Sequence, residues 1–245
     1  MVVRWADRRL VIRLAIAAVA AFGLGLPFLL LAVLVRGRWD PLQRLDLVVA
    51  RELNEFARGS GALVRALEIV AVVFDPNVFR VAAVGLAVWL FVRRSPRLAV
   101  WTLVTSLVGA LLGVLLKAVV GRARPTLDDP VAHAGGLSFP SGHALGSVVG
   151  CGVLLLVLTP LLSAGWRRVA WTAAVLIVLL VGFDRIALGV HYLSDVVAGW
   201  VIGLGWVALT AAVFEAWRRD VGLPPSPPSE VEPEIAEGVP EPRLG

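Results

Sequence analysis

The sequence predicts an all-α integral membrane protein, a six-helix bundle with a polar active site at one membrane face. Its 245 residues are 58% hydrophobic and 17% charged, whereas an ordinary soluble domain is about 45–50% apolar and about 25% charged. Several charge-free apolar runs approach the roughly 20 residues that a membrane-spanning helix needs. The only lysine and two of the three histidines lie at the ends of such runs, where ionisable residues point to function.

Six apolar stretches are predicted to span the membrane. They are residues 14–35, 76–92, 98–116, 144–166, 169–183 and 196–214. Two are weaker than the rest, because Arg80 interrupts the second stretch and the fifth is short. The first has the basic start of a signal peptide. Its 22 apolar residues are long for a signal core, however, and no clear cleavage site precedes Arg36, so an uncleaved span is expected.

The connection between the first two spans, residues 36–68, contains a different kind of helix. Apolar residues at 45, 48, 49, 53 and 56 follow helical spacing and predict an amphipathic helix over 45–56. Such a helix can lie at the membrane surface or pack over the end of the bundle, and the pattern fits both equally well. The pair Asp75-Pro76 predicts a break in the chain before the second span.

Glycine pairs at four-residue spacing predict where the spans touch one another. The pairs are Gly109/Gly113, Gly146/Gly150 and Gly199/Gly203. Because small residues let two helices approach closely, we expect these faces to pack inside the bundle and not to mediate dimerisation. No feature of the sequence specifies an oligomeric state.

The charges separate a membrane body from a tail. Residues 221–245 contain seven Pro and five Glu, a composition typical of disorder. Residues 1–220, the predicted six-span domain, carry 22 basic and 13 acidic residues, a net charge of +9 within the total of +5. The arginines flank the apolar runs instead of lining one face, so no nucleic-acid partner is indicated. The single cysteine, Cys151, excludes a disulfide within the chain.

The arginines also predict the orientation in the membrane. With the N-terminus in the cytoplasm, 11 basic residues flank the spans on the inside and seven on the outside. The positive-inside rule favours this arrangement. It turns the connections between spans three and four and between spans five and six toward the outside.

Those two connections carry the scarce polar residues. Lys117 ends the third span, Arg124-Pro125 follows in the loop, and Pro140-Ser141-Gly142-His143 opens the fourth. Asp184-Arg185 closes the fifth span, and His191 with Asp195 opens the sixth. Since two spans separate the connections, both must lie on the same membrane face. Two clusters that are distant in sequence thereby become neighbours.

The residue types in the two clusters suit phosphoryl transfer. Lys117, Arg124 and Arg185 are three cations that can converge on a phosphate, and the backbone amides of Ser141 and Gly142 precede a helix, where they can point at an anion. His191 and Asp195 are four residues apart on one helical face, so the carboxylate can orient the imidazole as a nucleophile. His143 can protonate the leaving oxygen. Taken singly, each residue also fits an interfacial anchor, a helix cap or a local ion pair.

In sequence, these clusters resemble the type 2 phosphatidic acid phosphatase family, which also includes the vanadium haloperoxidases. That family carries the blocks K-x6-R-P, P-S-G-H and S-R-x5-H-x3-D. The corresponding residues here are Lys117 to Pro125, Pro140 to His143, and Asp184 to Asp195. Order and spacing match, with one departure, since Asp184 stands where the family usually has Ser.

The resemblance implies a role for each matching residue. His191 is expected to be the nucleophile, Asp195 its partner and His143 the general acid. The residues expected to hold the phosphate are Lys117, Arg124, Ser141, Gly142 and Arg185. No metal or other cofactor is expected. Asp184 is left out of the expected site, because a carboxylate there repels a phosphate unless it is turned away or paired with Arg185. Arg122 is a candidate for steering anionic substrates, and His133 is expected to be a solvated loop residue.

The expected activity is hydrolysis of a lipid phosphate or diphosphate at the outer membrane face. A polyprenyl diphosphate is the first choice of substrate, and phosphatidic acid or phosphatidylglycerol phosphate is the close rival. The alternative is a transporter or carrier that binds anionic lipids without hydrolysing them, although no internal repeat is evident. Haloperoxidase chemistry is a third reading, which the transmembrane pattern disfavours.

Overall fold

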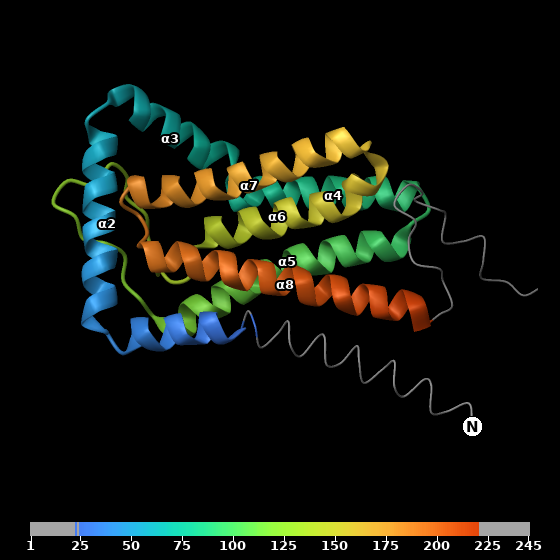
Figure 1. The fold of residues 1–245 in the computed structure, drawn as a ribbon, viewed down its shortest axis with the longest axis horizontal. Coiled ribbons are helices and arrows are strands. Elements are labelled where there is room, and N and C mark those ends of the chain that lie inside the picture. The colour runs from blue at the N-terminus through green and yellow to red at the C-terminus, as the bar shows by residue number, and fades with distance from the viewer. Residues whose placement is uncertain (1–22, 24, 221–245) are drawn as a thin grey trace, which may run out of the picture.

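The computed structural model describes residue 23, residues 25–215 and the backbone of residues 216–220. This part of the chain is helical and contains no strand (Figure 1). An apolar helix over Gly25–Arg36 precedes the labelled elements. These are α2 (Asp40–Arg58), α3 (Gly61–Val73), α4 (Pro76–Val92), α5 (Pro96–Val120), α6 (Gly142–Leu158), a 3₁₀ turn (Thr159–Leu161), α7 (Ala164–Ala187) and α8 (Leu193–Asp220).

Five segments of the described residues are long and apolar enough to cross a membrane. They are Gly61–Val92, Pro96–Val120, Gly142–Leu161, Ala164–Ala187 and Leu193–Glu215. The second predicted span coincides with α4, and Asp75 caps that helix by accepting a 2.7 Å hydrogen bond from the amide of Asn77. Most of the first predicted span, 14–35, and the predicted tail, 221–245, lie outside the described residues.

Three predicted boundaries are wrong for local reasons. The fourth predicted span is too long at its end: α6 stops at Leu158 because Pro160 cannot continue the helix, and the 3₁₀ turn that follows ends the segment at Leu161 instead of 166. The fifth begins at Ala164, so it is a full 24-residue helix whose first turns carry Arg167 and Arg168. The first connection, 36–68, is predicted to end where the chain is already helical, because α3 runs from Gly61 to Val73; the helix predicted over 45–56 lies within α2.

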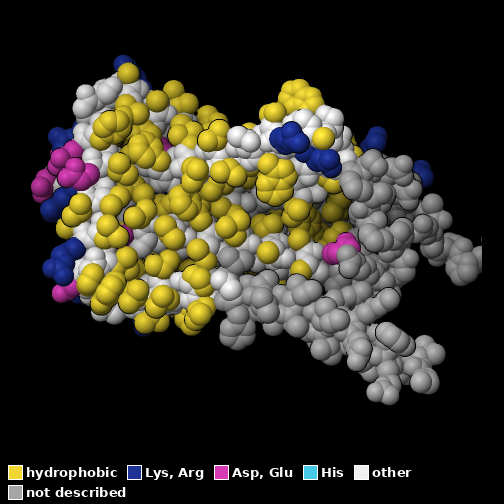
Figure 2. All heavy atoms as spheres, in the orientation of Figure 1, with side chains coloured by type: hydrophobic (Ala, Val, Ile, Leu, Met, Phe, Trp, Pro, Cys, Tyr) yellow, Lys and Arg dark blue, Asp and Glu magenta, His cyan; other side chains and the backbone are white. Residues whose placement is uncertain are grey.

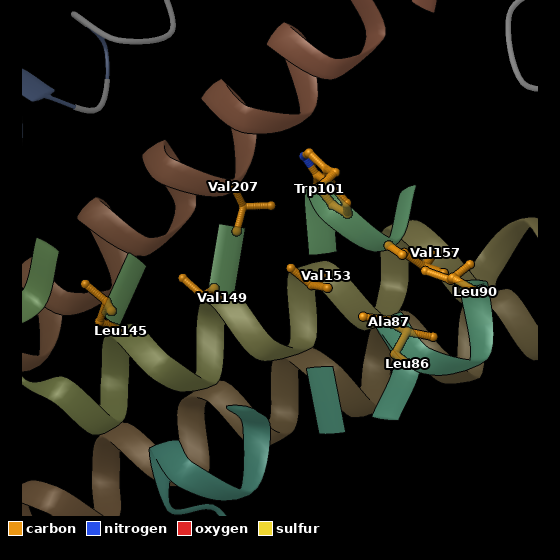
Figure 3. Close-up of a cluster of buried hydrophobic side chains, with 10 residues drawn as sticks. Leu86, Ala87, Leu90, Trp101, Leu145, Val149, Val153, Val157 and Val207 are labelled. Atoms are coloured by element: carbon orange, nitrogen blue, oxygen red, sulfur yellow. The ribbon is translucent and has the colours of Figure 1, made fainter. Parts of the chain in front are cut away.

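Helix α6 lies at the centre of the bundle and contacts α4, α5, α7 and α8. A core of buried side chains joins α6 to α4, α5 and α8 (Figure 3), and it includes Leu90, Trp101, Val153 and Val207. The glycine pairs are packed within the chain, as the sequence predicts. A Cβ added to Gly203 would lie 2.9 Å from Val148, and one added to Gly150 would lie 2.3 Å from the Phe79 ring.

Helix α2 crosses one end of the bundle, roughly perpendicular to the other helices (Figure 1). It packs on α7 and α8, so of the two positions that the sequence left open, the structure has the one over the end of the bundle. The face that it buries contains Asp46 and Asn54 beside alanines, whereas Leu45, Val48 and Phe56 are exposed. The buried polar groups have partners inside; Asn54, for example, donates a 3.0 Å hydrogen bond to the carbonyl of Ala187.

The surface has the distribution expected of a membrane protein. Hydrophobic side chains cover the middle of the visible face, and charged side chains gather toward its ends (Figure 2). Val81, Phe91 and Val114 are among the large hydrophobic side chains that the described helices expose. Together with the five long apolar helices, it identifies an integral membrane protein.

Candidate active site

Two connections bring the predicted residues together at the end of the bundle that α2 covers (Figure 1). One runs through residues 121–141 between α5 and α6, and the other through 188–192 between α7 and α8. The prediction that both lie on the same face is confirmed. The site is therefore assembled from the C-terminal ends of α5 and α7 and the N-terminal ends of α6 and α8.

His191 and Asp195 form a buried pair at the start of α8. The Nδ1 atom of His191 lies 3.3 Å from Oδ2 of Asp195. His191 is 2% exposed and Asp195 is completely buried. Because an ionised carboxylate can only accept hydrogen bonds, this contact assigns the ring proton to Nδ1 and leaves the lone pair on Nε2.

Other donors fix the Asp195 carboxylate in place. Oδ2 accepts hydrogen bonds from the hydroxyl of Ser138 and, at 2.9 Å, from the amide of Tyr192. Oδ1 accepts a 2.7 Å hydrogen bond from Nη1 of Arg122. The Ser138 hydroxyl also lies 3.4 Å from Nδ1 of His191. A carboxylate with this many donors keeps its charge and its orientation when buried.

Arg122 connects Asp195 to helix α2. Its Nη2 atom lies 2.7 Å from Oδ2 of Asp46, and its guanidinium lies 4.0 Å above the ring of Tyr192. Asp46 also accepts hydrogen bonds from the amide and the hydroxyl of Ser194, at 2.9 and 2.5 Å. Burial alone would lower the pKa of Arg122, but Asp195 and Asp46 outweigh it and raise that pKa. The expectation that Arg122 steers substrates is wrong, since its charge is taken up by two buried carboxylates.

Arg124 faces the other side of the His191 ring. Its Nη1 atom lies 3.1 Å from Nε2 of His191 and donates to the carbonyl of Val190 at 2.7 Å. Its Nε atom donates to the carbonyl of Gly135 at 3.0 Å. In this state a guanidinium N–H therefore covers the lone pair of the imidazole.

Lys117 and Arg185 complete the set of cations. The Nζ atom of Lys117 donates to the carbonyls of Leu137 and Ser138, at 2.7 and 3.1 Å. Nη1 of Arg185 lies 3.3 Å from Nε2 of His143. The three predicted cations thus lie around the two predicted histidines. Lys117 comes from α5, Arg124 from the loop that follows it, and Arg185 from α7.

His143 is held between charges of opposite sign. Besides Arg185, its Nε2 atom lies 3.5 Å from Oδ2 of Asp75, the residue that caps α4. Nε2 can accept from the guanidinium only when it is unprotonated, and it can donate to Asp75 only when it carries a proton. The two contacts therefore belong to different protonation states of His143.

The backbone at the start of α6 departs from the expected anion site in one respect. The amide of Ser141 donates a 2.9 Å hydrogen bond to the carbonyl of Asp195, and its side chain caps the helix by accepting from the amide of Ala144. Ser141 therefore joins α6 to α8, and its backbone amide is not free to bind an anion. The amides of Gly142 and His143, in the first turn, remain directed out of the helix end.

The surroundings of His191 keep its ring neutral. Burial lowers the pKa of His191 to about 4, and the positive charges of Arg124 and Lys117 act in the same direction, whereas Asp195 opposes them. Burial also lowers the pKa of Arg124, with a further contribution from Arg185. An uncharged imidazole beside several cations is what a nucleophile toward a phosphate requires.

Residues 98–219 match the model of the PAP2 superfamily. This range contains both connections and the helix ends of the site; α2 and Asp75 precede it. The chain belongs to the PAP2 superfamily. The PAP2 region includes each of the eight predicted site residues, from Lys117 to Asp195.

Several PAP2 relatives are lipid phosphatases by name. An undecaprenyl-diphosphatase of Sulfolobus acidocaldarius is 29% identical over 135 residues, 53% of this chain and 61% of that protein. Phosphatidylglycerophosphatase B of Bacillus subtilis is 36% identical over 112 residues, 44% of this chain and 54% of that protein. The chain therefore matches somewhat more than half the length of each.

The fold is also that of a solved PAP2 protein. The crystal structure of a transmembrane PAP2 type phosphatidylglycerolphosphate phosphatase from Bacillus subtilis superimposes with a TM-score of 0.71. The alignment covers 82% of this chain and 98% of that one, at 24% sequence identity. This likeness confirms the all-helical membrane fold.

The departure from the PAP2 pattern at position 184 has a local explanation. Oδ2 of Asp184 accepts hydrogen bonds from Nε, at 2.7 Å, and from Nη2 of Arg185. Asp184 is 1% exposed, and its Oδ1 atom has no hydrogen-bond partner among the described residues. The negative charge of Asp184 is thus paired with Arg185, which a carboxylate so close to a bound phosphate would need. Nη1 of Arg185 is not used in this pair and is directed toward His143.

Sequence reasoning missed four residues of this PAP2 site. They are Asp46, Asp75, Ser138 and Ser194. Only Asp75 carried a signal, as a break before a span, and that signal concerned the backbone. The other three reach the site by hydrogen bonds to residues that are distant in the sequence, and no local pattern predicts such contacts. His133 is an exposed loop residue, as expected.

Proposed function

We propose that this chain is a membrane phosphatase that hydrolyses lipid phosphates or diphosphates through a phosphohistidine intermediate. One observation carries the proposal. The Nε2 atom of the buried His191 has its lone pair directed at Arg124 while Nδ1 is held by Asp195, at the membrane-edge end of the bundle. The names of the relatives support a lipid phosphate as substrate.

In the first step, Nε2 of His191 attacks the terminal phosphorus and the bond from phosphorus to the leaving oxygen breaks. Asp195 stabilises the positive charge that develops on the ring. His143 gives its proton to the leaving oxygen. The substrate phosphate must first draw Arg124 away from Nε2, since the guanidinium prefers the charged oxygens of a phosphate to an imidazole nitrogen.

In the second step, water attacks the phosphohistidine. His143, now neutral, accepts a proton from the water, and the bond between phosphorus and Nε2 breaks to release inorganic phosphate. Lys117, Arg124 and Arg185 stabilise the negative charge on the equatorial oxygens in both steps. Gly142 and His143 supply backbone amides at the start of α6.

Charge stabilisation by these cations is proposed to make the reaction independent of a metal ion. Phosphate release from extensively dialysed protein in EDTA tests this point directly. Activity close to that of untreated protein is expected, and loss that is restored by a divalent cation would contradict it.

For the substrate, we propose a polyprenyl diphosphate first, with phosphatidic acid and phosphatidylglycerol phosphate as rivals. The arginines at the end of the bundle away from the site support a site on the outer face of the membrane. They include Arg93, Arg94, Arg167 and Arg168. A cysteine placed in the exposed loop around His133 and labelled by an impermeant reagent on intact cells tests this orientation.

The decisive experiment measures phosphate release by the purified protein from a panel of lipid phosphates and diphosphates. Release that disappears in His191→Ala and falls strongly in His143→Ala is expected. Brief incubation with substrate labelled at the terminal phosphate should trap an acid-labile phosphoenzyme in the wild type and none in His191→Ala.

The alternative of a lipid transporter or carrier predicts a different result, and vanadate gives a further test of the proposed site. A transporter or carrier would bind these lipids without releasing phosphate. Vanadate, a phosphate mimic, should inhibit release by occupying the cation cluster, and complete insensitivity to vanadate would count against the proposed site.

A further inference from the structure

A cavity of about 160 Å³ opens between α4, α5 and α6 beside the proposed site. At one end it is lined by Lys117 and Gly142, which belong to that site. Away from the site its walls are mostly apolar or glycine, and they include Phe79 and Gly146. The exceptions are the hydroxyl of Ser106 and Arg80, whose side chain is the one charged group in this part of the lining.

Arg80 is the only charged residue of α4, a helix that otherwise suits the interior of a membrane. Its Nη1 atom donates a hydrogen bond to the side chain of Asn77, three residues earlier. Because that partner lies toward the N-terminus of α4, the guanidinium extends toward the end of the helix where Asp75 contacts His143. Within the described part of the chain, Arg80 has no carboxylate partner.

An arginine in an apolar span is costly and is normally paired with an anion or a polar ligand. Among the described residues, Arg80 has the side chain of Asn77 as a polar partner and no anion from a neighbouring helix. Pro76 and Phe79 pack directly on the glycines of α6, as shown by Cβ atoms built on Gly146 and Gly150, which would lie 3.1 and 2.3 Å away. This close packing positions Arg80 at the edge of the cavity, where a ligand can reach it.

The proposed reaction directs the leaving group toward this cavity. In an in-line displacement the leaving oxygen lies opposite the attacking Nε2 of His191, beside the general acid His143. His143 follows Gly142 in the chain, and Asp75 precedes Pro76, and both Gly142 and Pro76 line the cavity. The group attached to the leaving oxygen therefore enters the cavity on the side of Arg80.

We infer that Arg80 binds the leaving phosphate of a lipid diphosphate and makes diphosphates the preferred substrate class. The inference rests on the proposed function. Hydrolysis of a diphosphate releases a lipid monophosphate, whose charged oxygens would lie between Lys117 and Arg80. Hydrolysis of a monophosphate releases an uncharged alcohol, which offers nothing for a guanidinium to bind.

The test compares a polyprenyl diphosphate with the monophosphate of the same chain. Arg80→Ala, Arg80→Gln and Arg80→Lys are purified, and kcat/KM is measured for both substrates. Removing one charge-assisted contact should lower kcat/KM for the diphosphate about 10-fold or more, with less than about a 3-fold change for the monophosphate. Arg80→Lys should recover part of the loss. Arg168→Ala removes the same charge from an exposed position at the opposite end of the bundle, and it should leave both values unchanged.

The outcomes separate this inference from the proposed function. Equal losses for the two substrates, or no loss for either, would overturn the role of Arg80 while leaving the phosphatase assignment intact. A wild-type protein that hydrolyses the monophosphate but not the diphosphate would do the same. Absence of phosphate release from both substrates by the wild type would instead overturn the proposed function. Monophosphate turnover by each Arg80 variant shows that it has folded.

Discussion

Asp46 of α2 and Arg122, which follows α5, form a 2.7 Å ion pair in which the carboxylate is completely buried. The same guanidinium reaches Asp195 at 2.7 Å with its other terminal nitrogen. A helix that lies across the end of the bundle is thereby bound to the residue that orients the proposed nucleophile. The proposed catalytic pair therefore depends on α2, although no residue of α2 is expected to touch the substrate.

Replacing Asp46 should therefore affect both stability and turnover. Asp46→Asn leaves the positive charge of Arg122 with one carboxylate instead of two, and breaking a buried pair costs about 3–5 kcal/mol. We expect a lower Tm in detergent and a kcat reduced about 10-fold, because Asp195 must then satisfy Arg122 alone. The exposed Glu52→Gln on the same helix is the matched control. An unchanged Tm and kcat in Asp46→Asn would show that the pair is dispensable.

Ser138 should matter for turnover more than for substrate binding. Its hydroxyl donates to Asp195 and lies beside Nδ1 of His191. Ser138→Ala removes a donor from the carboxylate oxygen that orients the ring, so kcat should fall about 10-fold with KM changed less than about 3-fold. Ser95→Ala removes another buried hydroxyl, one without a hydrogen-bond partner among the described residues, and serves as the control. A rise in KM at constant kcat would instead indicate direct contact with substrate.

The pKa of His191 gives a prediction with a definite sign. The ordinary value is 6.5, and burial lowers it to about 4 in the folded protein. Between these values the unfolded chain binds a proton that the folded one does not, so stability falls as the pH is lowered from about 6.5 to 4 and is unaffected by this group above 6.5. In His191→Gln this part of the pH dependence should be absent.

Nitrogen NMR of histidine-labelled protein measures the same group directly. The chain has only three histidines, and the spectrum of His191→Gln assigns the signal. We expect a neutral ring protonated at Nδ1 down to about pH 5. In Asp195→Asn, which removes the charge that opposes the shift, the pKa should be lower still. Titration of His191 near 6.5 in the folded protein would contradict the assignment of a buried neutral nucleophile.

Close packing of α8 on α6 should tolerate no added side chain. A Cβ on Gly199 would lie 2.7 Å from the carbonyl oxygen of Ser141 and 3.0 Å from Ala144. Gly199→Ala should therefore destabilise the protein by about 1–3 kcal/mol and lower activity, because the same helix begins beside His191. Gly85→Ala adds the same methyl group where nothing lies within 4 Å. Equal Tm values for the two variants would rule out this contact as a constraint.

The spans and the two functional clusters could be predicted from the sequence because both depend on local patterns. An apolar run of about 20 residues can be removed from water only in a membrane or a deep core. Helical spacing places His191 and Asp195 on one face. Counting the spans then shows that the two loops share a membrane face. The same reasoning misplaced the end of the fourth span, because Pro160 ends that helix inside the apolar run. It also misplaced the start of the fifth, because Arg167 and Arg168 interrupt the apolar pattern without interrupting a helix.

Sequence alone determined that this is a membrane bundle with a polar cluster of cations, histidines and a carboxylate at one face. Tertiary structure decided what each polar group is paired with. It showed that Arg122 is bound by two buried carboxylates, that Asp184 is held by Arg185, and that α2 buries Asp46 while it exposes apolar residues. Burial makes such pairings strongly favourable only when both partners meet in space, and a one-dimensional pattern does not record which distant residues meet.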